Sequence, residues 1–406
     1  MSWKETCAMS ERKKFVLDVL RDERPMSELC DLYGISRKTG YKWVDRFEQG
    51  GEGALADRSH ARRPQAHAVA APLVQRLVQV RRQHPSWGPR KLLAWLQEHE
   101  RPADWPAAST VGQILSRHGL VSGRRRRASA AEHLEVSLIQ PKAPNELWCT
   151  DFKGQFRTLD RYYCHPLTLT DAVSRYVLTC RGLRCQGTET ARPWFKRAFR
   201  EYGLPGAIRS DNGTPFASTG LGGLSRLSVW WIKLGIVPEL IAPGCPQQNG
   251  RHERMHKTLK AETTRPPGAD LQAQQRKFDR FVDEFNLQRP HEALQQRPPS
   301  AVYRASPRPY PSRLASIDYP ADYAVRQVRH NGEIKFANQT VFVSEVLRGE
   351  PVGLYQVDEH RWWLYFSMVP LGVLDTATMR IGRLKRHASN RLKGARGALP
   401  PAPPGR

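Results

Sequence analysis

Apolar residues recur at helical spacing through about the first 120 positions of the chain. Serine stands at the start of several of these segments, where its hydroxyl can cap a helix, and we expect helices that begin at Ser10, Ser27 and Ser36. A short helix, a turn that contains Gly34 and a second helix with basic residues form the helix-turn-helix pattern. Tight helical hairpins also occur without any DNA-binding function, so this pattern alone leaves both interpretations open.

Basic residues favour the DNA-binding interpretation. The second helix of the hairpin is rich in lysine and arginine, and an arginine-rich arm, residues 58–64, follows it. Positive charge clustered in this way is the electrostatic footprint of a nucleic-acid-binding protein. The residues that we expect to contact DNA in this region are Arg37, Lys38, Tyr41, Lys42, Arg62 and Arg63.

A second group of helices is predicted between residues 72 and 119. Apolar positions at helical spacing occur in residues 72–82, in GPRKLLAWLQEH (88–99) and in a segment that Ser109 can cap. This group resembles another helix-turn-helix, although three small helices need no function to exist. The polar and basic stretch that follows, up to Gln140, predicts a linker.

The apolar pattern changes at Asn145. Three β-rich runs, NELWCTDFKGQF, DRYYCHPLTLTD and SRYVLTCRG, are separated by short turns and predict an antiparallel meander. Helical and strand patterns then alternate: helices are expected at 188–203, 227–235, 247–262 and 269–286, and strands at 207–211 and 236–242. Three antiparallel strands followed by alternating elements predict a mixed five-stranded sheet with helices on its faces.

The last part of the chain returns to short strands. Asn331-Gly332 is a strong hairpin signal, and the surrounding runs predict a small all-β, barrel-like domain. We therefore expect a multidomain protein with N-terminal all-α helix-turn-helix units, a central α/β core and a C-terminal β domain. The expected boundaries are 1–56 (helix-turn-helix), 57–71 (basic arm), 72–122 (second helix-turn-helix-like domain), 123–140 (basic linker), 141–303 (α/β core), 304–375 (β domain) and 376–406 (basic disordered tail).

The formal charge of +25 and the pI near 10.2 indicate a polyanionic partner, and nucleic acid is the usual one. A solubilising surface is the alternative, but the charge is concentrated in blocks such as Arg124 to Arg127. No apolar run is long enough to span a membrane. Seven scattered cysteines without a CxxC pair argue against a disulfide framework and suit a reducing cytoplasm. With DNA as its partner, we expect a cytoplasmic protein that associates with the nucleoid.

Three carboxylates occupy unusual positions in the expected α/β core. Asp151 lies inside the first strand, where aspartate is a poor β-former. Asp211 lies where the fourth strand ends, which is where open α/β sheets place their sites. Glu253 lies in the first turns of a long helix. Each also has a structural interpretation: a hydrogen-bonded buried acid, an Asp-Asn-Gly turn, and an (i, i+4) pair with Lys257.

The three acids together favour a metal site. Two carboxylates about 4 Å apart repel by about 4 kcal/mol at an effective dielectric constant near 20. Divalent ions with oxygen ligands remove this repulsion, and Mg²⁺ accepts a few carboxylates together with water and phosphate oxygens. Helical spacing places Glu253, Lys257 and Lys260 on one face. We expect the acid to hold metal while Arg254, Lys257 and Lys260 hold the DNA backbone.

These motifs resemble bacterial insertion-sequence transposases of the DDE type with a retroviral-integrase-like catalytic core. The resemblance is carried by Asp151 in LWCTDFKG, Asp211 in SDNGTPF, Glu253 in PQQNGRHERMHKTLK, and NLQRPHEALQQRPPSAVY at the close of the core. It implies a ribonuclease-H-like fold, two Mg²⁺ ions (or Mn²⁺), and catalytic, metal-holding roles for Asp151, Asp211 and Glu253. It also implies binding of terminal inverted repeats and target DNA by a homo-oligomer on paired ends.

The implied reaction is cleavage at the element ends and joining of the freed 3′-hydroxyl to target DNA. Two departures accompany it: a longer spacing between Asp211 and Glu253, which we place in the Gly/Ser-rich segment 217–228, and helix-turn-helix units where retroviral integrases carry a zinc-binding domain. Two alternatives stay open. One is a catalytically inactive or domesticated DNA-binding relative, and the other is a ribonuclease-H-type nuclease acting on RNA–DNA hybrids.

Overall fold

The computed structural model describes residues 7–57, 69–101, 103–121 and 138–384. The chain divides into two compact units, Met1–Ala70 and Ala71–Arg406, which are treated separately below. The arginine cluster 124–127, Arg62, Arg63 and the end of the tail lie outside the described residues. Among the described helices, none is long and apolar enough to cross a membrane.

The first unit contains three helices, α1 (Ala8–Leu20), α2 (Met26–Leu32) and α3 (Arg37–Gly50). They close around a small apolar core formed by Phe15, Val16, Leu29, Cys30, Trp43 and Leu55. Ser36 caps α3 by accepting a hydrogen bond from the backbone N–H of Thr39, as expected. The cap predicted at Ser10 is wrong, because α1 begins three residues earlier: Cys7 is the N-cap and Ser10 completes a reciprocal capping box.

The second unit begins with three more helices, α4 (Ala71–Gln83), α5 (Pro89–His99) and α6 (Ala108–Arg117). Their buried positions recur at helical spacing, for example Leu92 and Leu96 on α5. The helix predicted to start at Ser109 begins at Ala108, and its N-cap is Ala107, whose side chain cannot accept a capping hydrogen bond. Helical N-terminal units of the expected type are therefore present in both units of the chain.

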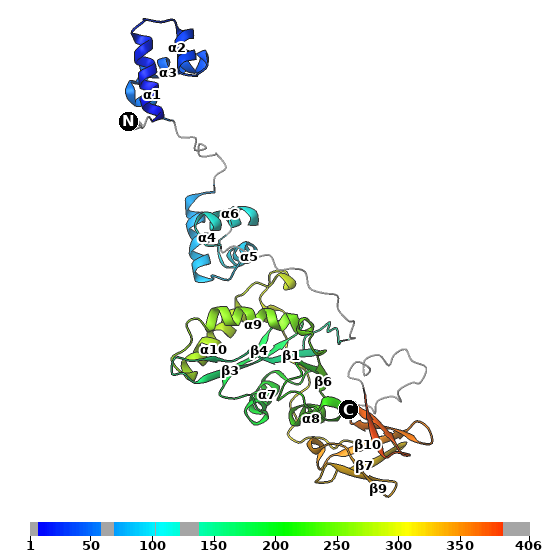
Figure 1. The fold of residues 1–406 in the computed structure, drawn as a ribbon. Helices are drawn as coiled ribbons and strands as arrows, with labels where there is room; N and C mark the ends of the chain where they lie inside the picture. The colour runs from blue at the N-terminus through cyan, green and yellow to red at the C-terminus, as the bar shows by residue number, and fades with distance from the viewer. Residues whose placement is uncertain (1–6, 58–68, 102, 122–137, 385–406) are drawn as a thin grey trace. The chain divides into compact units, whose positions relative to one another are not determined.

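A mixed sheet forms the centre of the second unit (Figure 1). Its strands are β1 (Leu147–Phe152), β2 (Phe156–Arg157), β3 (Tyr163–Asp171), β4 (Val177–Leu183), β5 (Ala207–Ser210) and β6 (Val237–Leu240). The order is β2-β3-β1-β5-β6, and β4 also pairs with β3. β3 is antiparallel to β1 and β4, whereas β1, β5 and β6 are parallel. The sheet contains one strand more than the five expected, the two-residue β2, because Gly154 at φ +46° turns the chain within the first β-rich run.

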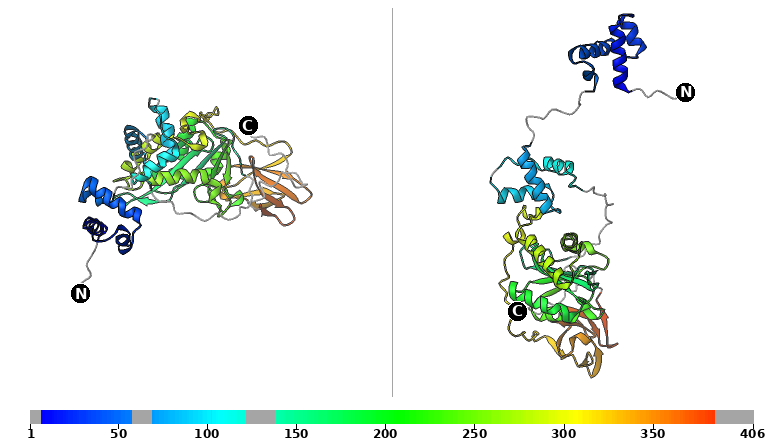
Figure 2. Two further views of the ribbon diagram at one scale, coloured as in Figure 1. Left: turned by 90° about the horizontal axis from the view of Figure 1, so that it is seen from above. Right: turned by 90° about the vertical axis from the view of Figure 1, so that its left-hand side faces the viewer.

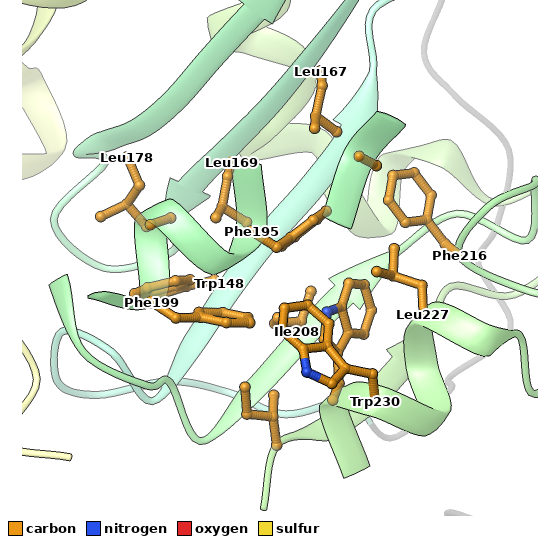
Figure 3. Close-up of a cluster of buried hydrophobic side chains, with 14 of the residues drawn as sticks. Trp148, Leu167, Leu169, Leu178, Phe195, Phe199, Ile208, Phe216, Leu227 and Trp230 are labelled. Carbon is orange, nitrogen blue, oxygen red and sulfur yellow. The ribbon is translucent and has the colours of Figure 1, made fainter. Parts of the chain in front are cut away.

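Helices cover both faces of this sheet (Figures 1 and 2). On one side, α7 (Thr188–Tyr202) and α8 (Arg226–Lys233) pack through an aromatic cluster that includes Trp148, Phe195, Phe199 and Trp230 (Figure 3). On the other side, α9 (Gly250–Thr263) and α10 (Leu271–Leu287) pack through Val177, Met255, Leu259, Phe278, Phe281 and Phe285. The mixed, helix-covered core predicted from the sequence is confirmed.

The C-terminal segment is all-β, but its sheets do not close into a barrel. Five strands run in the order β13-β12-β11-β10-β7, and β8 and β9 form a separate pair. Their bounds are β7 (Tyr323–Gln327), β8 (Glu333–Phe336), β9 (Gln339–Phe342), β10 (Pro351–Gln356), β11 (Arg361–Phe366), β12 (Val369–Asp375) and β13 (Arg380–Arg383). A shared apolar cluster joins this segment to Val229 and Ile232 of α8.

Two local expectations for this segment are wrong. The predicted hairpin at Asn331-Gly332 is only a turn, since β7 pairs with β10 and β8 pairs with β9. The tight hairpin lies instead at Ala337-Asn338, where both residues have positive φ, as a type I′ turn requires. Part of the segment expected to be a disordered tail from residue 376 onward forms β13, which pairs with β12.

Candidate active site

Two of the predicted acids sit on neighbouring parallel strands at the centre of the sheet. Asp151 is the one partly exposed residue in the otherwise buried β1, and its side chain is 26% exposed. Asp211 follows the last residue of β5, the parallel neighbour of β1. Its Oδ1 accepts a hydrogen bond from the N–H of Gly213 (3.1 Å), so the Asp-Asn-Gly turn is real as well. The turn holds the carboxylate at the strand end.

Burial and mutual repulsion perturb these acids. The pKa of Asp151 is raised to about 7 by burial first and then by the negative charge of Asp211, with a smaller contribution from Glu253. Burial also raises the pKa of Asp211, while the N–H of Gly213 opposes the rise. The charge of Asp211 thus disfavours the charged form of Asp151, and the positive charge of Lys153 only partly offsets this effect. A pair of this kind is typical of a functional site.

Glu253 lies in the first turn of α9 and is exposed. Its charge acts on Asp151 only weakly. Within the described residues, no group of three His, Cys, Asp or Glu side chains is close enough to hold a metal ion together. The structure therefore brings Asp151 and Asp211 together and leaves Glu253 at longer range. The donor set still fits Mg²⁺ or Mn²⁺, since it consists of hard carboxylate oxygens.

Helix α9 has two different faces. Arg254, Lys257 and Lys260 are exposed together with Glu253, as predicted. His252 and His256 of the same helix are instead buried with Met255 and Leu259 against the sheet. Burial lowers the pKa of His252 to about 3 and lowers that of His256 further below its usual range. The positive surface of α9 therefore comes from arginine and lysine alone.

The buried histidines belong to a polar network that the sequence reading missed. His252 Nε2 and His256 Nε2 lie 2.8 Å and 2.6 Å from Thr168 Oγ1. His252 Nδ1 lies 2.7 Å from Thr170 Oγ1, and His256 Nδ1 lies 3.5 Å from Asp151 Oδ2. A signal was present, because the histidines share the helical spacing of Met255 and Leu259 and therefore the apolar face.

Arg209 forms a second missed network beneath Asp211. Its Nε donates to Glu239 Oε2 on β6 (2.6 Å), and both side chains are at most 10% exposed. Its Nη1 donates to the carbonyl of Gln248, just before α9 (3.1 Å), and its Nη2 donates to the carbonyl of Ile139 (2.7 Å). One guanidinium thus joins the strand that precedes Asp211 to the loop that precedes the helix of Glu253.

The predicted DNA-contact residues of the first unit share one exposed surface. Arg37, Lys38, Tyr41 and Lys42 all lie on α3 and are exposed, and Tyr41 is 59% exposed. Their spacing (i, i+1, i+4, i+5) places them on one side of the helix. The buried Trp43 on the same helix packs in the core of the unit and holds that side outward.

Comparisons with known families give the domain types. The family described as "Integrase core domain" matches residues 141–246, and a second family with the same description matches residues 234–299. A "Helix-turn-helix domain" matches residues 11–64, and a "Homeodomain-like domain" matches residues 39–115. These matches cover the helical units and the mixed-sheet core described above.

Two curated relatives are insertion-element proteins. The IS407 uncharacterized 31.7 kDa protein of Burkholderia multivorans is 28% identical over 242 residues, which cover 58% of this chain and 82% of that protein. The IS476 uncharacterized 39.2 kDa protein of Xanthomonas euvesicatoria is 27% identical over 302 residues, which cover 71% of this chain and 76% of that protein.

Solved structures similar to the chain include the HTLV-2 integrase catalytic core domain in complex with magnesium, at 15% identity and a TM-score of 0.33 over 41% of this chain and all of that one. The simian T-cell lymphotropic virus intasome matches at 15% identity and a TM-score of 0.35 over 73% of this chain and 96% of that one. The family and relative matches support the resemblance drawn from the sequence: the chain is similar to insertion-element proteins, and helix-turn-helix families match it ahead of the integrase core families.

Proposed function

We propose that the chain binds the terminal inverted repeats of its own mobile element, cleaves at the element ends and joins the freed 3′-hydroxyl to target DNA. The observation that carries this proposal is the pair Asp151 and Asp211. Asp151 lies on β1, Asp211 directly follows the parallel neighbour β5, and burial together with the charge of Asp211 raises the pKa of Asp151 despite the nearby Lys153. Glu253 and a positively charged helix face stand on α9 above the same sheet. This arrangement suits a site that handles phosphates.

The three carboxylates are the proposed catalytic and metal-holding groups. Asp151, on the central strand, would hold both of two Mg²⁺ or Mn²⁺ ions, and Asp211 and Glu253 would each complete one. Two such ions would activate the attacking oxygen and stabilise the leaving oxygen of a phosphoryl transfer.

The remaining roles belong to the basic residues. Arg254, Lys257 and Lys260 would hold backbone phosphates beside the acids, and these contacts would position the DNA without reading its sequence. Sequence readout of the terminal repeat would come from the exposed side of α3, with Arg37, Lys38, Tyr41 and Lys42. Arg62 and Arg63 would add phosphate contacts from the arm. A homo-oligomer would bind two element ends and hold them together.

Cleavage of an end-labelled duplex that carries the element's terminus tests the proposal. We expect nicking at the element boundary with Mg²⁺, no nicking with EDTA, and loss of nicking in Asp211→Asn. Tight binding of the terminus without nicking in Mg²⁺ or Mn²⁺ would favour the inactive DNA-binding relative instead. Cutting of RNA–DNA hybrids without preference for the terminus would favour the ribonuclease-H-type nuclease.

End binding should depend strongly on salt. If about six phosphates are neutralised, affinity should fall roughly a thousandfold between about 50 and 200 mM salt, because each contact releases condensed counterions. Replacing both Lys257 and Lys260 by glutamine should reduce the slope of log affinity against log salt by about two. Lys196→Gln is the matched control, since this exposed lysine lies on α7, across the sheet. Fluorescence anisotropy at a series of salt concentrations measures both effects, and an affinity insensitive to salt would contradict them.

A further inference from the structure

One buried hydroxyl lies between the strand of Asp151 and the helix of Glu253. Thr168 of β3 is fully buried and is the cross-strand partner of Asp151 in the register of β1 and β3. Its Oγ1 lies 3.0 Å from the backbone oxygen of Asp151. The same Oγ1 lies 2.8 Å from His252 Nε2 and 2.6 Å from His256 Nε2. Groups from β1 and α9 therefore meet at one oxygen atom of β3.

The hydrogen count at this oxygen fixes the direction of every bond. A carbonyl oxygen only accepts, so the single hydroxyl hydrogen of Thr168 is donated to Asp151 O. Thr168 Oγ1 then has two lone pairs left, and each of them accepts a hydrogen from one imidazole Nε2. His252 and His256 must therefore both carry a hydrogen on Nε2. The hydroxyl of Thr170 is in place to donate to His252 Nδ1, at 2.7 Å.

These hydrogen bonds are directional, whereas the apolar packing of α9 is not. Met255 and Leu259 hold the helix against the sheet, but apolar contacts are non-directional and tolerate rotation or sliding. His252 directly precedes Glu253, and His256 follows one turn later, so bonds from both histidines fix how far the helix is turned about its axis. His256 Nδ1 also lies 3.5 Å from Asp151 Oδ2 and, within the described residues, has no hydrogen-bond partner.

We propose that Thr168 is a positioning residue: by accepting from His252 and His256 while donating to the backbone of Asp151, it sets the placement of Glu253 relative to Asp151. The expected effect of Thr168 on cleavage rests on the proposed metal-dependent function. The hydrogen-bonding pattern around Thr168 does not depend on that function. Thr168 touches neither DNA nor metal in this account. It acts through β1 and α9.

Replacement of the hydroxyl tests the consequence. Thr168→Val keeps the shape of the side chain and removes the common partner of three groups. We expect end nicking to fall about a hundredfold, as for a displacement of reacting groups by about 1 Å, and the half-saturating Mn²⁺ concentration to rise about tenfold or more. Thr168→Ser keeps the hydroxyl and should restore both values to within about threefold. Binding of the terminus by the helix-turn-helix domains should not change.

Thr263→Val is the matched control for this series. Thr263 is a buried residue of the same helix, but its hydroxyl donates only to the carbonyl of Leu259, one turn earlier in α9. Nicking by Thr263→Val should stay near that of the wild type. Equal nicking and equal Mn²⁺ dependence in Thr168→Val and Thr263→Val would overturn the proposal, and so would failure of Thr168→Ser to restore activity.

A second measurement tests the hydrogen-bonding pattern at Thr168 even if Thr168→Val does not fold or the wild type does not nick. Long-range ¹H–¹⁵N spectra of the full wild-type chain with labelled histidine report which ring nitrogen carries hydrogen, and His252→Gln and His256→Gln assign the signals. Hydrogen on Nε2 of both rings supports the junction. A ring of either residue without hydrogen on Nε2 overturns it. Absence of nicking by the wild type, with hydrogen on both Nε2 atoms, would count against the proposed function alone.

Discussion

Asp151→Asn should abolish end cleavage and strand transfer while binding of the terminal repeat stays within about twofold of the wild type, since the proposed sequence readout lies on α3. An amide cannot supply the negative charge that a bridging carboxylate contributes. Metal ions stabilise charge in the transition state by several kcal/mol, and each 1.36 kcal/mol is tenfold in rate. We therefore expect a loss of roughly a thousandfold or more. Gel assays of nicking and of 3′-end joining on labelled duplexes, alongside anisotropy for binding, measure it.

Controls separate this loss from misfolding. Glu253→Gln should give the same pattern, and Asp283→Asn, which changes an exposed acid on α10, should nick normally.

The folded-state pKa of Asp151 is about 7, above its ordinary 3.8. Between pH 3.8 and about 7, the folded chain keeps a proton on Asp151 that the unfolded chain releases. The free energy of unfolding of the wild type therefore falls as the pH rises through this interval, whereas that of Asp151→Asn does not fall for this reason. In EDTA at about pH 8, Asp151→Asn should thus melt above the wild type. Normal nicking by Asp151→Asn or Glu253→Gln would refute the assignment.

Arg209→Ala should cause a large loss of folding stability. The substitution removes the charged partner of the buried Glu239, which then keeps the hydrogen bond from the N–H of Ile139, and it removes donors from the carbonyls of Gln248 and Ile139. Breaking a buried ion pair by removing one partner costs about 3–5 kcal/mol, because the remaining charge is uncompensated. Trp148, Trp230 and Trp231 in the core on the other side of the sheet report unfolding through their fluorescence during a urea titration.

An exposed arginine provides the matched comparison. Arg197 has a side chain that is 69% exposed and lies 3.8 Å from Glu201, so Arg197→Ala should cost less than about 1 kcal/mol. Replacing Arg209 by Met together with Glu239 by Leu should recover much of the stability lost in Arg209→Ala, since an apolar pair leaves no buried charge. Equal urea midpoints for Arg209→Ala and Arg197→Ala would show that the buried pair does not hold this part of the core.

The sequence predicted those features of the core that depend on local periodicity and turn chemistry. The β-rich composition of the run that contains β1 placed Asp151 in a strand, and the helical spacing in α9 placed Glu253 at the start of a helix. Ser36 was recognised as a cap because its hydroxyl competes for a nearby backbone N–H. In each case the deciding interaction spans only a few residues.

Features that depend on distant partners were missed. His252 and His256 look like surface charge beside Arg254 until Thr168 and Thr170, more than eighty residues away in the chain, are placed against them. Asn331-Gly332 has the composition of a hairpin, but the partner of β7 is β10. The burial of Arg209 is set by Glu239 and Gln248, which are also distant in sequence. Such contacts leave no periodic signal in the chain.

Mn²⁺ binding tests most directly whether Asp151, Asp211 and Glu253 act as one metal site. The full chain, bound to a duplex that carries the element's terminus, is titrated with Mn²⁺ while electron spin resonance measures the free ion. We predict saturable binding to the wild type that is weakened at least about tenfold by Asp151→Asn, Asp211→Asn or Glu253→Gln, and is unaffected by Asp283→Asn. Wild-type affinity in any one of the first three variants would contradict the account.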